Sequence, residues 1–162
     1  RESEFVDYKS GVSARMSITA FENLLSTAER RALRSGTEKT TVRLADFMGI
    51  IPAITGKVEL VYEGEQEGAA EVAELLIGSA IKSFFPGYFP NIEKLEKPNE
   101  KSPYQEIIDW FFNESGFELL DDTSDEEYKK QLDSIIPLKQ LVQRYQPDVP
   151  AEDQYFLIAD IT

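Results

Sequence analysis

The 162-residue sequence predicts a mainly α protein made of two helical parts. Long segments repeat apolar residues at intervals of three and four, only one short segment alternates as a strand would, and the charge balance changes near residue 90. Residues 1–90 hold 10 bases and 13 acids, whereas residues 91–162 hold 7 bases and 17 acids. We therefore expect a helical domain over 1–90, a proline-containing linker over 91–103, and a smaller acidic helical domain over 104–162.

The first helix is expected to run to about residue 34, because apolar residues recur at helical spacing and Gly36 is a natural C-terminal stop. Its apolar positions are Ala20, Phe21, Leu24, Leu25, Ala28, Ala32 and Leu33. Thr19 and Glu22 form a capping-box pattern at its start, although Ser13 or Ser17 could equally cap it.

The other elements are predicted in the same way, from the spacing of apolar residues and the positions of prolines. Residues 40–44 are expected to be extended, and residues 44–54 to be helical with a bend or a stop at Pro52. Residues 57–63 fit a strand or a helical turn almost equally well. Strong helical periodicity returns over 68–85, and further helices are expected over about 103–114 and 125–146, the last interrupted by Pro137. Most of the aromatic residues near 84–89 and 104–112 are expected to pack the two halves together.

Composition excludes several classes of function. The net charge of −13 disfavours binding to nucleic acid or to an anionic membrane, because both require a basic face. The sequence contains no cysteine and no histidine, which removes zinc sites, thiol nucleophiles, disulfides and serine–histidine hydrolases. Apolar runs are too short to cross a membrane and no signal-peptide pattern opens the chain, so we expect a soluble, cytoplasmic protein. Both ends resemble cut ends.

Arg15 is the candidate functional residue. It stands alone at the start of the first amphipathic helix, in the run Gly11-Val-Ser-Ala-Arg15. A guanidinium is permanently charged and donates in a planar fork, which suits a phosphate oxygen arriving from another domain. The alternative is a solvated charge near a helix start, where the helix dipole slightly disfavours it.

Four runs carry a family resemblance: Gly11-Val-Ser-Ala-Arg-Met-Ser-Ile, Glu22-Asn-Leu, Ala28-Glu-Arg-Arg-Ala-Leu-Arg34, and Pro52-Ala-Ile-Thr-Gly-Lys-Val-Glu-Leu-Val-Tyr-Glu-Gly64. They resemble the region after the ATPase core in bacterial magnesium chelatase subunit I, in the MoxR-like branch of AAA+ ATPases. The resemblance covers about residues 8–85 and implies a helical lid that closes over ATP and Mg²⁺ held by an upstream P-loop domain, usually within a homo-oligomeric ring. In such proteins a sensor-2 arginine begins a lid helix, and the resemblance carries that role to Arg15.

Three other features are weaker candidates for a functional site: a run similar to a P-loop, a cluster of arginines and an acidic stretch. Ile51-Pro-Ala-Ile-Thr-Gly56-Lys57-Val58 overlays the tail of a P-loop, but its first glycine and its closing serine or threonine are replaced, so Gly56 is expected to cap a helix. Without a Walker motif the isolated chain should not hydrolyse ATP, and no catalytic residue is predicted. The cluster of Arg30, Arg31 and Arg34 could reach a neighbouring subunit or be a solvated face.

The acidic stretch from residue 114 to 127 contains seven acids and no base. It lacks the ligand spacing and central glycine of a calcium loop, so we expect no metal site, and a cap at Ser124 or Asp125 instead. The competing function is a non-catalytic helical adaptor whose acidic half binds a protein partner.

Overall fold

The computed structural model describes residues 3–7, 9, 12–91, 102–114, 116–120 and 123–161. The described chain is mainly helical, as predicted. Its elements are α1 (Met16–Ser35), the 3₁₀-helix η1 (Leu44–Ile50), α2 (Ile51–Thr55), α3 (Tyr62–Glu67), α4 (Ala69–Tyr88), α5 (Gln105–Asn113), α6 (Asp125–Ser134), α7 (Ile136–Tyr145) and α8 (Ala151–Ile161). Of the predicted linker over 91–103, residues 92–101 lie outside the described residues.

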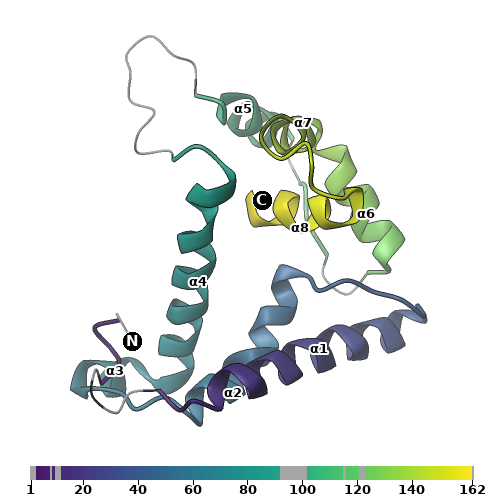
Figure 1. The fold of residues 1–162 in the computed structure, drawn as a ribbon. Helices are drawn as coiled ribbons and strands as arrows, with labels where there is room; N and C mark the ends of the chain where they lie inside the picture. The colour runs from purple at the N-terminus through teal and green to yellow at the C-terminus, as the bar shows by residue number, and fades with distance from the viewer. Residues whose placement is uncertain are drawn as a thin grey trace.

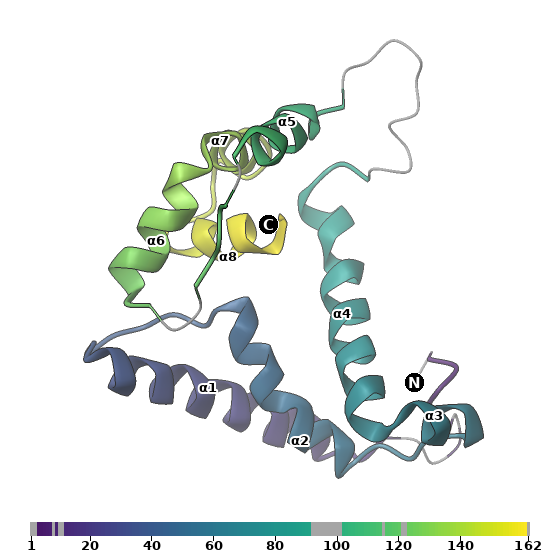
Figure 2. The same cartoon turned by 180° about the vertical axis from the view of Figure 1, so that it is seen from behind.

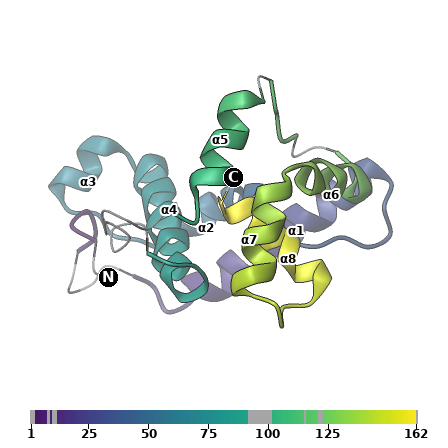
Figure 3. The same cartoon turned by 90° about the horizontal axis from the view of Figure 1, so that it is seen from above.

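The helices form two groups (Figure 1). The first group consists of α1, η1, α2, α3 and α4. Helix α1 runs beneath η1 and α2, and α4 rises from the far end of α2. Helices α5 to α8 form the second group, which stands above the C-terminal end of α1 (Figure 2). Seen from above, α4 and the second group lie on opposite sides of the molecule (Figure 3).

Helix α1 begins earlier than the capping-box pattern indicates. Its N-cap is Arg15, and the Thr19 hydroxyl donates to the Arg15 carbonyl over 3.2 Å, so Thr19 lies inside the first turn and the capping box at Thr19 and Glu22 is wrong. The Ser13 hydroxyl instead accepts from the Arg15 amide. The predicted C-terminal stop is confirmed, because Gly36 takes the left-handed conformation with φ of 70°.

The segment from Leu44 to Thr55 is helical, as predicted, but its first seven residues form a 3₁₀-helix. Pro52 lies in the first turn of α2, where its missing amide costs no helical hydrogen bond, and Gly56 is the C-cap residue expected of it. Residues 57–63 fit neither alternative alone. Val58 and Leu60 form isolated antiparallel bridges with Val12 and Val6, and helix α3 then starts at Tyr62.

Two apolar clusters hold the described helices together. In the first half, Ile54 of α2 packs with Ala73 and Ile77 of α4. The larger cluster lies in the second group of helices, where Leu132, Ile135, Leu138, Val142 and Ile158 are almost fully buried. Pro137 separates α6 from α7 as predicted, by starting α7 in its first turn.

The halves are also joined near the end of α4. Phe89 is buried in the second cluster and Phe85 packs against it. The Tyr104 hydroxyl donates to the Pro90 carbonyl over 2.6 Å. Burial raises the pKa of Tyr104 to about 12, which keeps this donor protonated. The prediction that the aromatic residues pack the halves together therefore holds for Phe85, Phe89 and Tyr104, whereas Phe84 and Phe112 are exposed.

Helix α8 was not predicted from the sequence. It supplies Leu157, Ile158 and Ala159 to the second cluster. None of the helices in the described residues combines the length and the apolar character needed to cross a membrane.

Gly49 provides a test of how α1 packs on η1. A Cβ atom at Gly49 would collide with the Thr27 hydroxyl of α1. We expect Gly49→Ala to lower the free energy of unfolding by about 1–3 kcal/mol, as overpacked cores do, and Thr27→Ala to restore part of the loss, because it removes the hydroxyl but keeps the Thr27 Cβ 2.9 Å from the added atom. Urea unfolding measures both. Gly78→Ala is the matched control, because nothing lies within 4 Å of its added Cβ. Equal effects of the two glycine substitutions would contradict the close approach.

Candidate functional site

Arg15 is held by its backbone while its side chain is exposed. Its amide donates to the Ser13 hydroxyl over 3.3 Å, and its carbonyl accepts from the amide and the hydroxyl of Thr19. These bonds fix the direction in which α1 starts. Within the described residues, the guanidinium of Arg15 makes no hydrogen bond or ion pair. No described residue therefore competes for its donors.

An apolar stripe adjoins Arg15 on the exposed side of α1. Ile18 is 62% exposed, Phe21 is 60% exposed and Leu25 is 40% exposed. These residues follow Arg15 at helical spacing, so they share one side of the N-terminal half of α1. The sequence pattern placed Phe21 and Leu25 on the core side, and the structure buries Ala28 and Ala32 of that set instead. Adjacent exposed apolar side chains of this kind are candidates for a surface that another domain or protein covers.

The three clustered arginines of α1 have different surroundings. Arg30 is exposed. Arg34 is also exposed, in the last turn of the helix. Arg31 is only 9% exposed and uses its donors inside the chain. A contact with a neighbouring subunit stays a prediction for Arg30 and Arg34, whereas Arg31 belongs to a buried cluster.

The first half of this buried cluster joins α1 to η1. The Arg31 guanidinium donates from Nη2 to one Asp46 carboxylate oxygen over 2.8 Å and from Nε to the other over 3.2 Å. This is a two-point contact between an arginine fork and a carboxylate. Asp46 also accepts from the backbone amide of Arg43 over 2.8 Å, so it caps the start of η1 as well. Arg31 further donates to the Thr41 carbonyl over 2.7 Å.

The second half of the cluster crosses to α6. Arg43 donates from Nη2 to Asp125 Oδ1 over 2.7 Å and to the Thr123 carbonyl over 3.0 Å. Its guanidinium carbon also lies 4.0 Å from the centre of the Tyr128 ring, in a cation–π contact. Arg31 reaches the same Asp125 oxygen over 3.1 Å. Two arginines thus share two aspartates, and their formal charges cancel.

The Arg–Asp cluster shifts the pKa values of two of its members. Burial by itself raises the pKa of Asp125, but hydrogen bonds from Arg43 and Thr40 and the charges of both arginines outweigh it and hold that pKa below its usual value. Burial lowers the pKa of Arg31, and the hydrogen bonds and charges of Asp46 and Asp125 more than reverse this effect. Both shifts favour the charged forms of Arg31 and Asp125 at neutral pH.

Sequence reasoning missed most of this cluster. Arg43 and Asp46 were not singled out, and Asp125 was expected only as a cap or as part of a solvated acidic loop. Ser124 does cap α6, through a capping box with Glu127. The spacing from Arg43 to Asp46 at the start of η1 was a usable signal for a local cap. Nothing local indicates that Arg31 meets Asp125, because 94 residues separate them.

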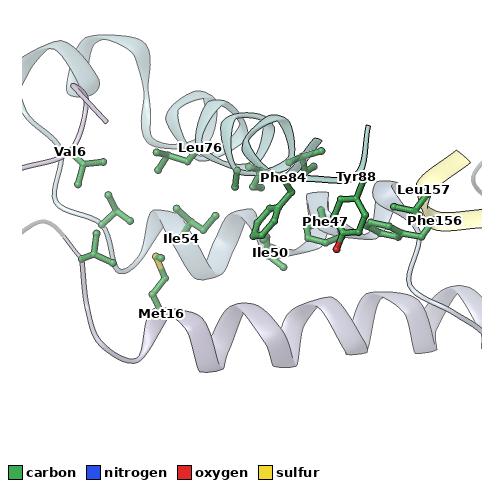
Figure 4. A pocket seen from close by; sticks show the side chains of 15 residues that line it. Val6, Met16, Phe47, Ile50, Ile54, Leu76, Phe84, Tyr88, Phe156 and Leu157 are labelled. Atoms are coloured by element: carbon green, nitrogen blue, oxygen red, sulfur yellow. The ribbon is translucent and has the colours of Figure 1, made fainter. Parts of the chain in front are cut away.

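An apolar groove lies between α4 and the segment formed by η1 and α2, and α8 borders one end of it (Figure 4). Its volume is about 420 Å³. Leu76 and Phe84 of α4 face Ile50 and Ile54 across it, as the view in Figure 4 shows. Val6, Met16, Phe47, Tyr88, Phe156 and Leu157 complete the labelled lining. Among the described lining residues none carries a charge, and the Tyr88 hydroxyl is the single polar group of the set.

Comparison with known proteins adds no relative. No family model, no curated protein and no solved structure matches the chain.

Removing Asp125 should destabilise the fold strongly. We expect Asp125→Ala to lower the free energy of unfolding by about 3 kcal/mol, because Arg43 and Arg31 would remain buried without a shared partner. Glu126→Ala is the matched control, since it removes an exposed acid from the same helical turn and should cost less than about 1 kcal/mol. Urea unfolding at neutral pH compares the two. A loss no larger than that of the control would show that the cluster contributes little.

Stability should also depend on the ionisation of Asp125. Because its pKa is lowered in the folded chain, its contribution is complete above the unfolded pKa of about 3.9 and is lost as the pH falls through the folded value. The gap in unfolding free energy between wild type and Asp125→Asn should therefore be constant above about pH 5 and narrow below about pH 4. Urea unfolding at a series of pH values measures it. A gap that widens on acidification would contradict the lowered pKa.

Proposed function

We propose that this chain is the lid and the appended helical part of a AAA+ ATPase similar to magnesium chelatase subunit I. In this proposal it couples ATP binding and hydrolysis in a P-loop domain outside the chain to the remodelling of a partner or of a metal-chelatase complex. The observation that carries the proposal is the state of Arg15, which starts α1 with an exposed guanidinium that no described residue engages. The resemblance over residues 8–85 supplies the family.

The exposed stripe beside Arg15 supports the same proposal. A lid must pack against the domain that holds the nucleotide, and such packing needs apolar surface next to the residue that reaches the phosphates. Ile18, Phe21 and Leu25 provide that surface on the same helix. Full burial of one large apolar side chain stabilises a contact by about 1.5–3 kcal/mol, so covering this stripe would hold the lid firmly against its partner domain.

Arg15 is suited to sense nucleotide by its charge and geometry. Phosphoryl transfer to water spreads negative charge over the phosphate oxygens, and a positioned guanidinium stabilises that charge. ATP and Mg²⁺ would be held by the P-loop domain, and Arg15 is the residue of this chain proposed to touch the nucleotide. Its backbone bonds to Ser13 and Thr19 make α1 move with it. Contact with phosphate would thereby set the position of the whole helix.

Further parts of the proposal follow from the family. The complete protein would form a homo-oligomeric ring in the cytoplasm, with Arg30 and Arg34 of α1 exposed toward a neighbouring subunit. The second candidate function is a helical adaptor without a nucleotide link, in which the acidic half binds a protein partner. The apolar groove offers a binding surface that involves no nucleotide, to which the acidic half contributes Phe156 and Leu157 of α8.

The test is steady-state ATP hydrolysis by the full-length protein that contains this chain. We expect Arg15→Ala to reduce turnover tenfold or more, equivalent to at least about 1.4 kcal/mol of lost transition-state stabilisation. Arg144→Ala is the matched control, because Arg144 is also an exposed helical arginine but lies on α7. It should leave the rate unchanged.

Stability measurements separate sensing from folding. In the isolated chain, Arg15→Ala should change the free energy of unfolding by less than about 0.5 kcal/mol, because the side chain is exposed and bonds to none of the described residues. Equal hydrolysis by wild type and Arg15→Ala would remove the sensor role. A full-length protein that neither binds nor hydrolyses ATP would leave the adaptor function in its place.

A further inference from the structure

Helix α5 carries apolar residues on two sides, and the described chain covers only one of them. Ile107 is buried in the second cluster, and Trp110 and Phe111 pack against it. Ile108 and Phe112 lie one residue later at the same four-residue spacing, on a face turned by about 100°. Ile108 is 48% exposed and Phe112 is 87% exposed, the largest exposed fraction of any large apolar side chain in the described residues. We call Ile108 and Phe112 the α5 face, a candidate interaction surface.

The α5 face is accessible and has a firm support behind it. Helix α5 lies on the side of the second group away from α1 (Figures 1 and 2). On its inner side, Trp110, Phe111 and Phe117 meet edge to face with ring centres 5.0–5.9 Å apart, and the helix packs against α7. These contacts fix the backbone that carries Phe112. An aromatic anchor on a fixed helix loses little backbone freedom on binding, which favours an interaction.

The charged residues around the α5 face in the sequence are all acids. Residues 102–128 contain nine acids and no base. The exposed acids on α5 and just after it are Glu106, Asp109, Glu114 and Glu118. Asp109 is three residues from Phe112, so the two side chains are neighbours on the helix surface. Gln105 donates to the Asp109 carboxylate over 2.9 Å, and this neutral donor leaves the negative charge in place.

The bases of the second group do not cancel this charge. Residues 102–161 hold fourteen acids and four bases, a net charge of −10. The four bases are Lys129 and Lys130 on α6 and Lys139 and Arg144 on α7. Residues 92–101 hold three acids and three bases, which balance. A partner that approaches the second group therefore meets a negative potential.

The two bases on α7 matter most, because α7 packs against α5. Lys139 donates to the Asp133 carboxylate over 2.5 Å, so its charge is paired. Arg144 directly precedes Tyr145. Burial and the charge of Tyr145 raise the pKa of Tyr104, which places Tyr145 near the N-terminal end of α5. Neither base therefore offsets the acids at the C-terminal end of α5.

This charge selects the kind of occupant. A second copy that met the α5 face through the same face would bring two groups of net charge −10 together. Nucleic acid and anionic membranes would be repelled in the same way. A protein surface that combines an apolar pocket with a basic rim gains attraction instead, and the apolar contact supplies its affinity.

We propose that the α5 face binds a partner protein through an apolar pocket that receives Phe112 and is rimmed by lysine or arginine residues. Ile108 would pack on the wall of this pocket, and the basic rim would face Asp109 and the acids that follow α5. The inference rests on the protein partner that both candidate functions include. It does not depend on contact between Arg15 and a nucleotide.

The experiment is site-specific photo-crosslinking of the full-length protein in the cells it comes from. The photoreactive amino acid p-benzoylphenylalanine replaces Phe112, and mass spectrometry identifies the crosslinked protein and the crosslinked peptide. Leu33 is the matched control position, because it is 82% exposed but lies on α1. The identified partner is then purified, and its affinity for the isolated chain is measured by fluorescence anisotropy with wild type, Phe112→Ala, Asp109→Lys and Leu33→Ala.

The α5 position should capture a partner that the α1 position does not, at a site with apolar residues flanked by lysine or arginine. We expect Phe112→Ala to weaken binding at least tenfold, Asp109→Lys to weaken it about threefold or more, and Leu33→Ala to leave it unchanged. Raising the salt concentration from about 0.05 to 0.3 M should also weaken binding, because the charges meet near the surface. Thermal unfolding of each variant checks that the fold is retained, since all three side chains are exposed.

Five results would overturn the proposal: no crosslink from position 112, the same partner from position 33, an acidic or neutral crosslinked surface, a second copy as the captured protein, or equal losses of affinity in Phe112→Ala and Leu33→Ala. None of these measurements involves ATP hydrolysis. A failure here therefore leaves the sensor role of Arg15 untouched, and loss of that role leaves this result standing.

Discussion

The fold depends on a buried ionic cluster in which the Arg31 guanidinium bonds Asp46 and Asp125 and the Arg43 guanidinium bonds Asp125. Removing four charges from water is costly, and the cluster offsets that cost through hydrogen bonds of 2.7–3.2 Å from the Arg31 guanidinium and from Arg43 Nη2 to carboxylate, carbonyl and hydroxyl oxygens. Buried side-chain polar atoms without a partner are absent from the described residues, so the cluster leaves no unmet hydrogen bond there. These hydrogen bonds would break if α1, η1 and α6 slid a short distance past one another. Its main contribution is therefore to select one orientation of α1, η1 and α6 over others that apolar packing alone would accept.

The same cluster explains why a groove can remain open. The two groups of helices are joined at the cluster and again near Phe89 and Tyr104, where α4 ends and α5 begins. Between these two junctions α4 and α8 lie apart, as both side views show (Figures 1 and 2). Closing the groove would require α4 to move relative to α8 and would disturb one of the junctions. These two junctions lie outside the groove, whereas within its lining Phe47 of η1 and Phe156 of α8 approach each other with ring centres 6.2 Å apart.

Helical periodicity was sufficient to predict most elements and insufficient to place their exposed faces. Residues 16–35, 69–88 and 105–113 carry repeated apolar positions, so local pattern and tertiary packing agree there. Helix α8 was missed because its apolar run is short and lacks an N-terminal capping pattern. Phe21 and Leu25 were expected in the core, since periodicity cannot distinguish a face covered by the same chain from one left exposed. The contact between Arg31 and Asp125 was beyond prediction, because it depends on how distant helices pack.

Arg15 and Arg31 occupy opposite ends of one helix, and this arrangement connects the proposed site to the rest of the fold. Sixteen residues separate them, so they lie about 24 Å apart along α1. A straight helix transmits a displacement at one end to the other, because its hydrogen bonds resist stretching and bending. Arg31 would pass that displacement to Asp125 and so to α6, whereas Met16 at the first end borders the groove. If a phosphate moves Arg15, α1 therefore carries that displacement to the second group of helices and to the wall of the groove.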